Sequence, residues 1–192
     1  MSMPTLFVSH GPPTLILEDL PARAFLASLG QQVPRPKAIV AVSAHWNTDK
    51  PAVSTAARPE TVHDFYGFPD ALYRLHYAAP GAPELAERVA ELTGAVRVPG
   101  QGLDHGAWVL AMLGWPEADI PTFQLSVQPH QSPAHHIAAC PGFDHAGRAE
   151  FLEHGRRVGG MLEVNLLLRR RYGQNKSLDV GHGASSLVDV MS

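Results

Sequence analysis

Two short apolar runs constrain the fold of this chain more than any other feature of its sequence. The runs lie at residues 5–9 and 38–43. A strand with one face in water alternates apolar and polar residues, whereas a strand covered on both faces is apolar throughout. The two runs therefore predict buried strands within a sheet, and residues 121–127 are predicted to form a third buried strand.

Helical patterns lie between and after these runs, and they complete the predicted fold class. Residues 83–93 begin with a proline, carry an acidic residue early and stop before Gly94, as helices commonly do. Further helices are predicted at residues 22–29, 104–113 and around 161–171. Strands that alternate with helices predict an α/β fold, in which helices pack on a mostly parallel or mixed central sheet.

Size and composition narrow the class of protein. A chain of 192 residues with 45% hydrophobic residues can bury one sizeable core. Its formal net charge of -3 favours neither nucleic acid nor anionic lipid as a partner. The single cysteine, Cys140, excludes an internal disulfide framework, and no run approaches the roughly 20 apolar residues of a membrane span. We therefore expect a cytoplasmic protein that binds neither nucleic acid nor membrane.

Two of the eleven histidines stand directly after predicted strands. His10 follows the first run and His45 follows the second. Small molecules and ions that bind to open α/β sheets do so beyond the carboxyl ends of the strands. Neutral imidazole coordinates iron, zinc or copper well. This placement favours a shared metal ion, although each histidine could instead form a hydrogen bond to a nearby loop.

The histidines belong to short motifs that together resemble a known family. The motifs are SHGPP at residues 9–13, SAHW at 43–46, HDFYGFP at 63–69 and GLDHGAW at 102–108. In this order and approximate spacing, they resemble the LigB-type extradiol dioxygenase superfamily, and within it the 4,5-DOPA dioxygenase extradiol group. The resemblance covers roughly residues 4–136 and rests on several independent motifs.

The resemblance implies an enzyme that opens a catechol ring beside its two hydroxyls. Its reactants would be a DOPA-like catechol and O₂, and its cofactor one divalent metal ion, non-haem Fe(II) or Zn(II). By motif matching, His10 and His45 would be metal ligands and His105 the catalytic group for proton transfer, a task that suits an imidazole pKa of about 6.5. The substrate-binding residues would be His63, Phe65 and Phe68. Assembly into a homo-oligomer is left open.

The resemblance to the family stops near residue 138. Because the rest of the chain does not match, functions other than ring cleavage stay open. We expect a partial LigB-like domain at residues 1–138 and a divergent tail at 139–192, so that the fold would be truncated or divergent at its carboxyl end. Relatives of this kind take a third metal ligand from the half that does not match. The alternatives are a non-catalytic family member that binds metal or a partner, and a metal-dependent hydrolase.

Overall fold

The computed structural model describes residues 6–132, 134–136 and 165–166. Six strands form one sheet in the order β1-β6-β2-β5-β3-β4. The elements in the first half of the chain are β1 (Leu6–Phe7), the 3-10 helix η1 (Pro13–Leu17), α1 (Pro21–Gln32), β2 (Ile39–Asn47) and β3 (Ala52–Ser54). They are followed by α2 (Asp70–Tyr73), α3 (Pro83–Thr93), β4 (Val96–Val98), α4 (His105–Gly114), β5 (Thr122–Val127) and β6 (Asn165–Leu166).

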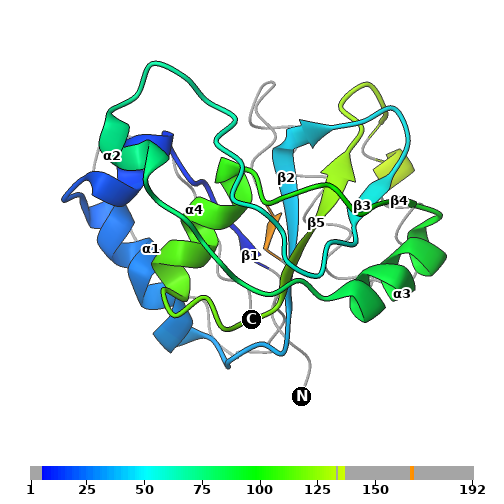
Figure 1. Ribbon diagram of the computed structural model, residues 1–192, viewed down its shortest axis with the longest axis horizontal. Coiled ribbons are helices and arrows are strands. Elements are labelled where there is room, and N and C mark those ends of the chain that lie inside the picture. Colours follow the sequence, from blue (N-terminus) through cyan, green and yellow to red (C-terminus); the bar gives the residue numbers. More distant parts are fainter. Residues whose placement is uncertain (1–5, 133, 137–164, 167–192) are drawn as a thin grey trace.

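The sheet is mixed, with helices on both faces, which confirms the predicted α/β fold class. At its centre β2 and β5 run parallel, with Ile39 opposite Thr122. Strand β3 is parallel to β4 and antiparallel to β5. Figure 1 shows α1 and α4 on one side of the sheet and α3 on the other.

Strand β6 contradicts part of the predicted helix at residues 161–171. Asn165 and Leu166 pair antiparallel with both β1 and β2, so the helix prediction is wrong for these two residues. An apolar run can pack on a sheet as a helix or join it as a strand, and local periodicity does not distinguish the two. The rest of that prediction lies outside the described residues, as does almost all of the tail predicted from residue 139.

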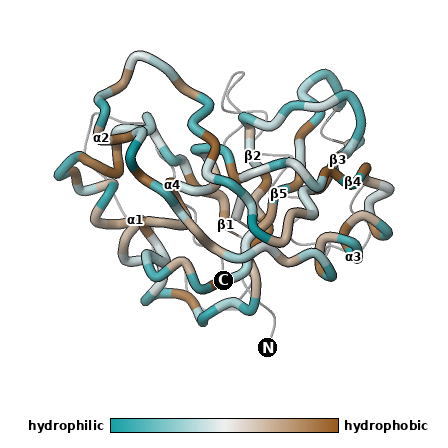
Figure 2. Tube along the Cα trace, in the orientation of Figure 1, coloured by the Kyte–Doolittle hydropathy of each residue, from teal (hydrophilic) through white to brown (hydrophobic). Residues whose placement is uncertain are grey.

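Helix α4 is the central helix of the larger core. Nine of its ten residues are buried, which fits a segment that is apolar on all sides. Trp108 and Leu110 pack there with Leu26 of α1 and Ile39 of β2. A second cluster, which includes Ala86 of α3, covers the other face of the sheet. Figure 2 shows hydrophobic colour around β5, between these two layers.

Helix α3 has the predicted bounds, whereas α1 is longer than predicted. Gly94 caps α3 with a left-handed φ of 67°, as its position after the last helical residue predicts. A helix was predicted at residues 22–29, but α1 begins at Pro21 and continues through Gly30 to Gln32. The reason is packing, because Gly30 lies against the backbone of Gly114 in α4.

We expect Gly30→Ala to destabilise the protein through this contact. A Cβ at Gly30 would lie 2.1 Å from the backbone oxygen of Gly114, so α1 and α4 would have to separate. Overpacking of this kind costs about 1–3 kcal/mol, and each kcal/mol lowers the Tm by roughly 2–4 °C in a chain of this size. The matched control is Gly100→Ala, since no heavy atom lies within 4 Å of a Cβ there. Equal Tm values for the two variants would contradict the prediction.

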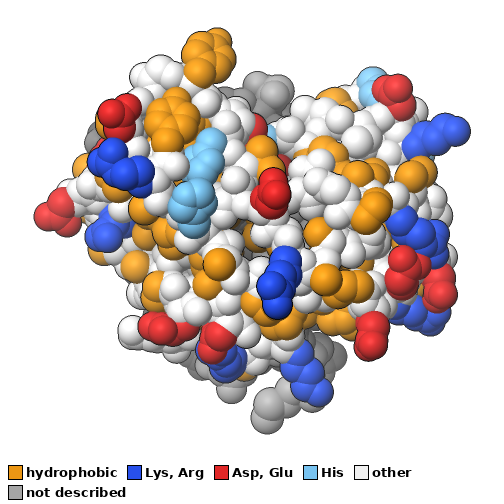
Figure 3. All heavy atoms as spheres, in the orientation of Figure 1, with side chains coloured by type: hydrophobic (Ala, Val, Ile, Leu, Met, Phe, Trp, Pro, Cys, Tyr) orange, Lys and Arg blue, Asp and Glu red, His pale blue; other side chains and the backbone are white. Residues whose placement is uncertain are grey.

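Among the described residues, no helix combines the length and apolar composition needed to cross a bilayer. Figure 3 shows basic and acidic side chains interspersed on the visible face rather than gathered into a patch of one sign.

Candidate metal centre

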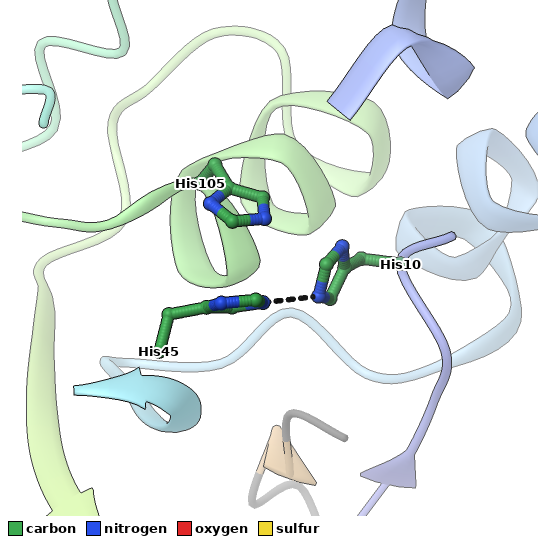
Figure 4. Close-up of side chains that lie close together, drawn as sticks. All are labelled: His10, His45 and His105. Atoms are coloured by element: carbon green, nitrogen blue, oxygen red, sulfur yellow. Dashed lines mark hydrogen bonds between the residues drawn. The ribbon is translucent and has the colours of Figure 1, made fainter. Parts of the chain in front are cut away.

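Three histidines from separate parts of the chain meet at one edge of the fold. His10 lies in the loop after β1, His45 lies near the end of β2, and His105 is the first residue of α4. One nitrogen from each ring can be chosen so that all three lie within 4.8 Å of one another. Figure 4 shows the three rings turned toward a common point. We call these residues the histidine cluster.

The rings of the histidine cluster are in close contact. Nε2 of His10 lies 3.0 Å from Nε2 of His45. The ring centroids of His45 and His105 are 3.9 Å apart, and those of His10 and His105 are 4.9 Å apart. His10 and His105 are buried, whereas His45 is exposed, so solvent can approach the cluster from the His45 side.

The donor set and its spacing fit a divalent transition metal. Imidazole nitrogens bind zinc at about 2.0–2.1 Å, so two such ligands of one ion lie roughly 3 Å apart. The Nε2 atoms of His10 and His45 are hydrogen-bonded at 3.0 Å, a separation close to this spacing.

Electrostatics keep the two candidate ligands neutral. Burial, followed by the neighbouring His105 and His45, lowers the pKa of His10 from 6.5 to about 4. Burial and His105 also lower the pKa of His45. Because a metal binds only the unprotonated ring, both shifts favour ligation near neutral pH.

Asp64 holds His105 in place. Its Oδ1 accepts hydrogen bonds from Nδ1 of His105 at 2.8 Å and from the backbone N–H of His105 at 3.0 Å. Burial would raise the pKa of Asp64, but these hydrogen bonds outweigh burial and keep the pKa of Asp64 below its ordinary value. Asp64 is therefore a carboxylate near neutral pH.

An irregularity in β2 sets the position of His45. The pairing with β5 is regular up to Val42, opposite Leu125, and then shifts, so that Asn47 lies opposite Val127. His45 lies inside the shifted stretch. Irregularities of this kind bend a strand and redirect its side chains, and they are common beside functional sites.

A buried polar network supports both His45 and the start of α4. Ser43 Oγ donates to Asp104 Oδ1 at 2.7 Å and accepts from the backbone N–H of His45 at 3.1 Å. Gln124 Nε2 donates to Asp104 Oδ2 at 2.7 Å. Asp104 also caps α4 by accepting from the backbone N–H of Ala107. Burial raises the pKa of Asp104, and the Ser43 and Gln124 hydrogen bonds oppose that rise.

We expect Asp104→Ala to destabilise the protein by about 3 kcal/mol. The change removes the helix cap, which costs about 1 kcal/mol, and leaves the buried Ser43 and Gln124 groups without an acceptor, at about 1–3 kcal/mol. Denaturant unfolding measures this loss. Asp49→Ala is the control, because Asp49 is exposed. A loss below about 1 kcal/mol for Asp104→Ala would contradict this function of the network.

The predicted substrate residues differ in how close they lie to the histidine cluster. The Phe65 ring is 5.6 Å from the His105 ring, and Phe68 is 5.4 Å from Phe65. His63 lies behind Phe65, where its Nε2 donates to the backbone oxygen of Leu75 at 3.0 Å and its ring contacts Trp108. Phe65 is therefore the residue of this group in direct ring contact with the cluster.

Sequence reasoning did not single out Asp64, Ser43 or Gln124. Asp64 stands beside His63 in a histidine motif, so its place in the motif was the available signal. Ser43 opens the SAHW motif, so it had the same kind of signal as Asp64, whereas Gln124 lies in a predicted strand outside the histidine motifs. Their partners are distant in the sequence, and only the folded chain brings them together.

Comparisons with known proteins agree with this arrangement. The family model described as the catalytic LigB subunit of aromatic ring-opening dioxygenase matches residues 4–149. The protein named 4,5-DOPA dioxygenase extradiol from Beta vulgaris is 46% identical over 141 residues, which cover 69% of this chain and 53% of that protein. The protein of the same name from Escherichia coli K12 is 46% identical over 139 residues, which cover 70% of this chain and 51% of that protein.

A solved structure supports the same relationship. The crystal structure of an uncharacterized protein from Escherichia coli K12 matches with a TM-score of 0.57 at 37% identity, covering 70% of this chain and 51% of that one. The chain thus spans about half the length of the curated relatives that it matches. The match to the family model over residues 4–149 shows that this chain belongs to the LigB family of aromatic ring-opening dioxygenases.

Proposed function

We propose that the histidine cluster is the metal centre of an extradiol dioxygenase that opens the ring of a DOPA-like catechol with molecular oxygen. The observation that carries this proposal is the convergence of His10, His45 and His105, whose nitrogens lie within 4.8 Å of one another in a LigB-family chain. The names of the relatives support the choice of substrate class, since two are named 4,5-DOPA dioxygenase extradiol.

His10 and His45 are the residues that would hold the metal. Their Nε2 atoms are 3.0 Å apart and approach each other directly. A bound Fe(II) or Zn(II) ion would supply Lewis-acid polarisation of the catechol oxygens and a common place for both reactants. The exposed side of His45 gives a catechol access to this place.

His105 is the proposed proton acceptor and donor. Its ring lies against both His10 and His45, so a catechol held by those residues would have its hydroxyls near the His105 imidazole. Histidine can take a proton from a hydroxyl near neutral pH and later return it to the product. His105 performs this role without leaving its place, because Asp64 anchors it.

Phe65 and Phe68 form the proposed apolar wall beside the reacting ring. Phe65 contacts His105 on one side and Phe68 on the other. Apolar walls of this kind bind the aromatic ring of a substrate and keep water away from reactive species. His63 supports this wall, because its ring contacts Phe65 while its Nε2 holds the backbone at Leu75.

Oxygen consumption tests the proposal. The full chain would be loaded with Fe(II) under anaerobic conditions and then mixed with oxygen and a panel of catechols. We expect catechol-dependent oxygen uptake and a yellow ring-opened product, and no uptake with a catechol whose hydroxyls are methylated. Metal binding without any uptake would contradict the proposed function, and zinc-dependent ester hydrolysis without uptake would favour a hydrolase instead.

A further inference from the structure

One carboxylate oxygen beside the histidine cluster receives two hydrogen bonds from the same residue. Oδ1 of Asp64 lies 2.8 Å from Nδ1 of His105 and 3.0 Å from the backbone N of His105. The His105 side chain is 7% exposed and the Asp64 side chain 25% exposed, so these contacts are partly shielded from water. The two bonds fix both the ring and the first backbone N–H of α4.

The chemistry of the two groups determines where the hydrogen lies. A carboxylate can only accept hydrogen bonds, so the His105 nitrogen that faces Asp64 must carry the hydrogen. In a neutral imidazole the other nitrogen then has the lone pair. For His105 the nitrogen with the hydrogen is Nδ1, and the nitrogen with the lone pair is Nε2.

We propose that Asp64 is a positioning residue that holds His105 as its Nδ1–H tautomer, so that the Nε2 lone pair is available to the histidine cluster. Figure 4 shows the His105 ring standing over His45 and beside His10. Asp64 acts only through His105 and does not touch the reacting atoms. Neither the motifs nor the family relationship assigned it this function.

The consequence for catalysis rests on the proposed function of the cluster. A catechol hydroxyl proton would move to Nε2 of His105, and the O–H bond would break as the N–H bond forms. The resulting imidazolium would be paired with the Asp64 carboxylate through Nδ1–H, which stabilises its positive charge. The same proton would then return from Nε2 to the ring-opened product, so no external acid or base is consumed.

The identity of the acceptor atom suggests two informative substitutions. Asp64→Asn keeps an oxygen that can accept from both N–H groups, but it removes the negative charge. Asp64→Ala removes the acceptor, so the His105 ring becomes free to adopt the Nε2–H tautomer or to turn. Asp70→Ala is the control, because Asp70 is an exposed carboxylate six residues further along the same segment.

Nitrogen-15 NMR of the metal-free full chain tests the tautomer without any need for turnover. Two-bond correlations distinguish the protonated nitrogen from the unprotonated one, and the spectrum of His105→Gln identifies the signals of His105. We expect Nδ1–H in the wild type, in Asp64→Asn and in Asp70→Ala, and loss of that pattern in Asp64→Ala. An Nε2–H tautomer in the wild type, or an unchanged pattern in a folded Asp64→Ala, would overturn the proposal.

A kinetic comparison adds a second readout in the iron-loaded chain. Loss of a hydrogen-bond partner that orients a catalytic histidine typically costs 10- to 100-fold, and we expect Asp64→Ala to lower kcat by that factor with little change in KM. Asp64→Asn should recover part of the loss, because it keeps the tautomer. A chain that shows the expected tautomers but no oxygen uptake would count against the proposed function and leave the role of Asp64 supported.

Discussion

His105→Ala is expected to lower catechol turnover by roughly 10²- to 10⁴-fold while the chain keeps its metal. Its ring lies against both His10 and His45, and its Nδ1 is held by Asp64. An imidazole in this position can exchange a proton with a catechol. Loss of a general acid-base group of this kind lowers turnover by the factor given above. Steady-state oxygen uptake gives the turnover, and elemental analysis of the same samples gives the metal content.

His76→Ala is the matched control for this experiment. His76 is exposed and contacts His63 rather than the histidine cluster, so its removal should leave turnover within a few-fold of the wild type. Unchanged turnover in His105→Ala would defeat the catalytic assignment. Loss of metal together with turnover would make His105 a third ligand, an arrangement that the 4.8 Å spacing of the cluster also permits.

Removal of either His10 or His45 should release the metal. The two Nε2 atoms lie 3.0 Å apart, so each residue would provide one of the closest donors. We expect His10→Ala and His45→Ala each to weaken metal affinity by more than about 100-fold, beyond the 10- to 100-fold cost of losing a partner that merely orients a ligand. Competition with a coloured chelator measures the affinity. Full retention of metal by either variant would exclude that residue from the site.

Acidification should weaken metal binding in the wild type, but only below the ordinary pKa of histidine. Protons compete with the metal for neutral imidazole, so affinity falls as the pH falls. Burial lowers the pKa of His10 from 6.5 to about 4 and lowers the pKa of His45, so competition at these residues begins at lower pH than in a free imidazole. The same chelator titration, repeated over a pH series, should give a midpoint below 6.5. A midpoint above that value would contradict the roles of His10 and His45.

The central part of the fold could be predicted because its signals are local. A continuous apolar run indicated the strand that became β2, residues 121–127 were predicted as the strand that became β5, and a proline and a glycine at its ends indicated α3. The short strands β3 and β4 were not predicted, since runs of three residues carry too little pattern. Strand β6 was predicted as helix because its pairing with β1 and β2 depends on residues far away in the sequence.

The candidate site was predictable only in part, for a similar reason. Histidine motifs indicated His10, His45 and His105, and the structure brings all three together. Their separate roles as ligands or catalytic group stay predictions. The anchoring of His105 by Asp64 spans 41 residues, and the Asp104 and Gln124 contact joins α4 to β5. Local sequence patterns do not show which residues form such tertiary contacts.

Isotope labelling tests the proposed function most directly. The iron-loaded chain would react with a DOPA-like catechol under ¹⁸O₂, and mass spectrometry would count the labelled atoms in the product. Extradiol cleavage at the histidine cluster predicts a ring-opened product that carries an oxygen atom from O₂ in its new carboxylate group, and no such product from His10→Ala. A product with an intact ring, or a ring-opened product without oxygen from O₂, would contradict the assignment of this chain as an extradiol dioxygenase.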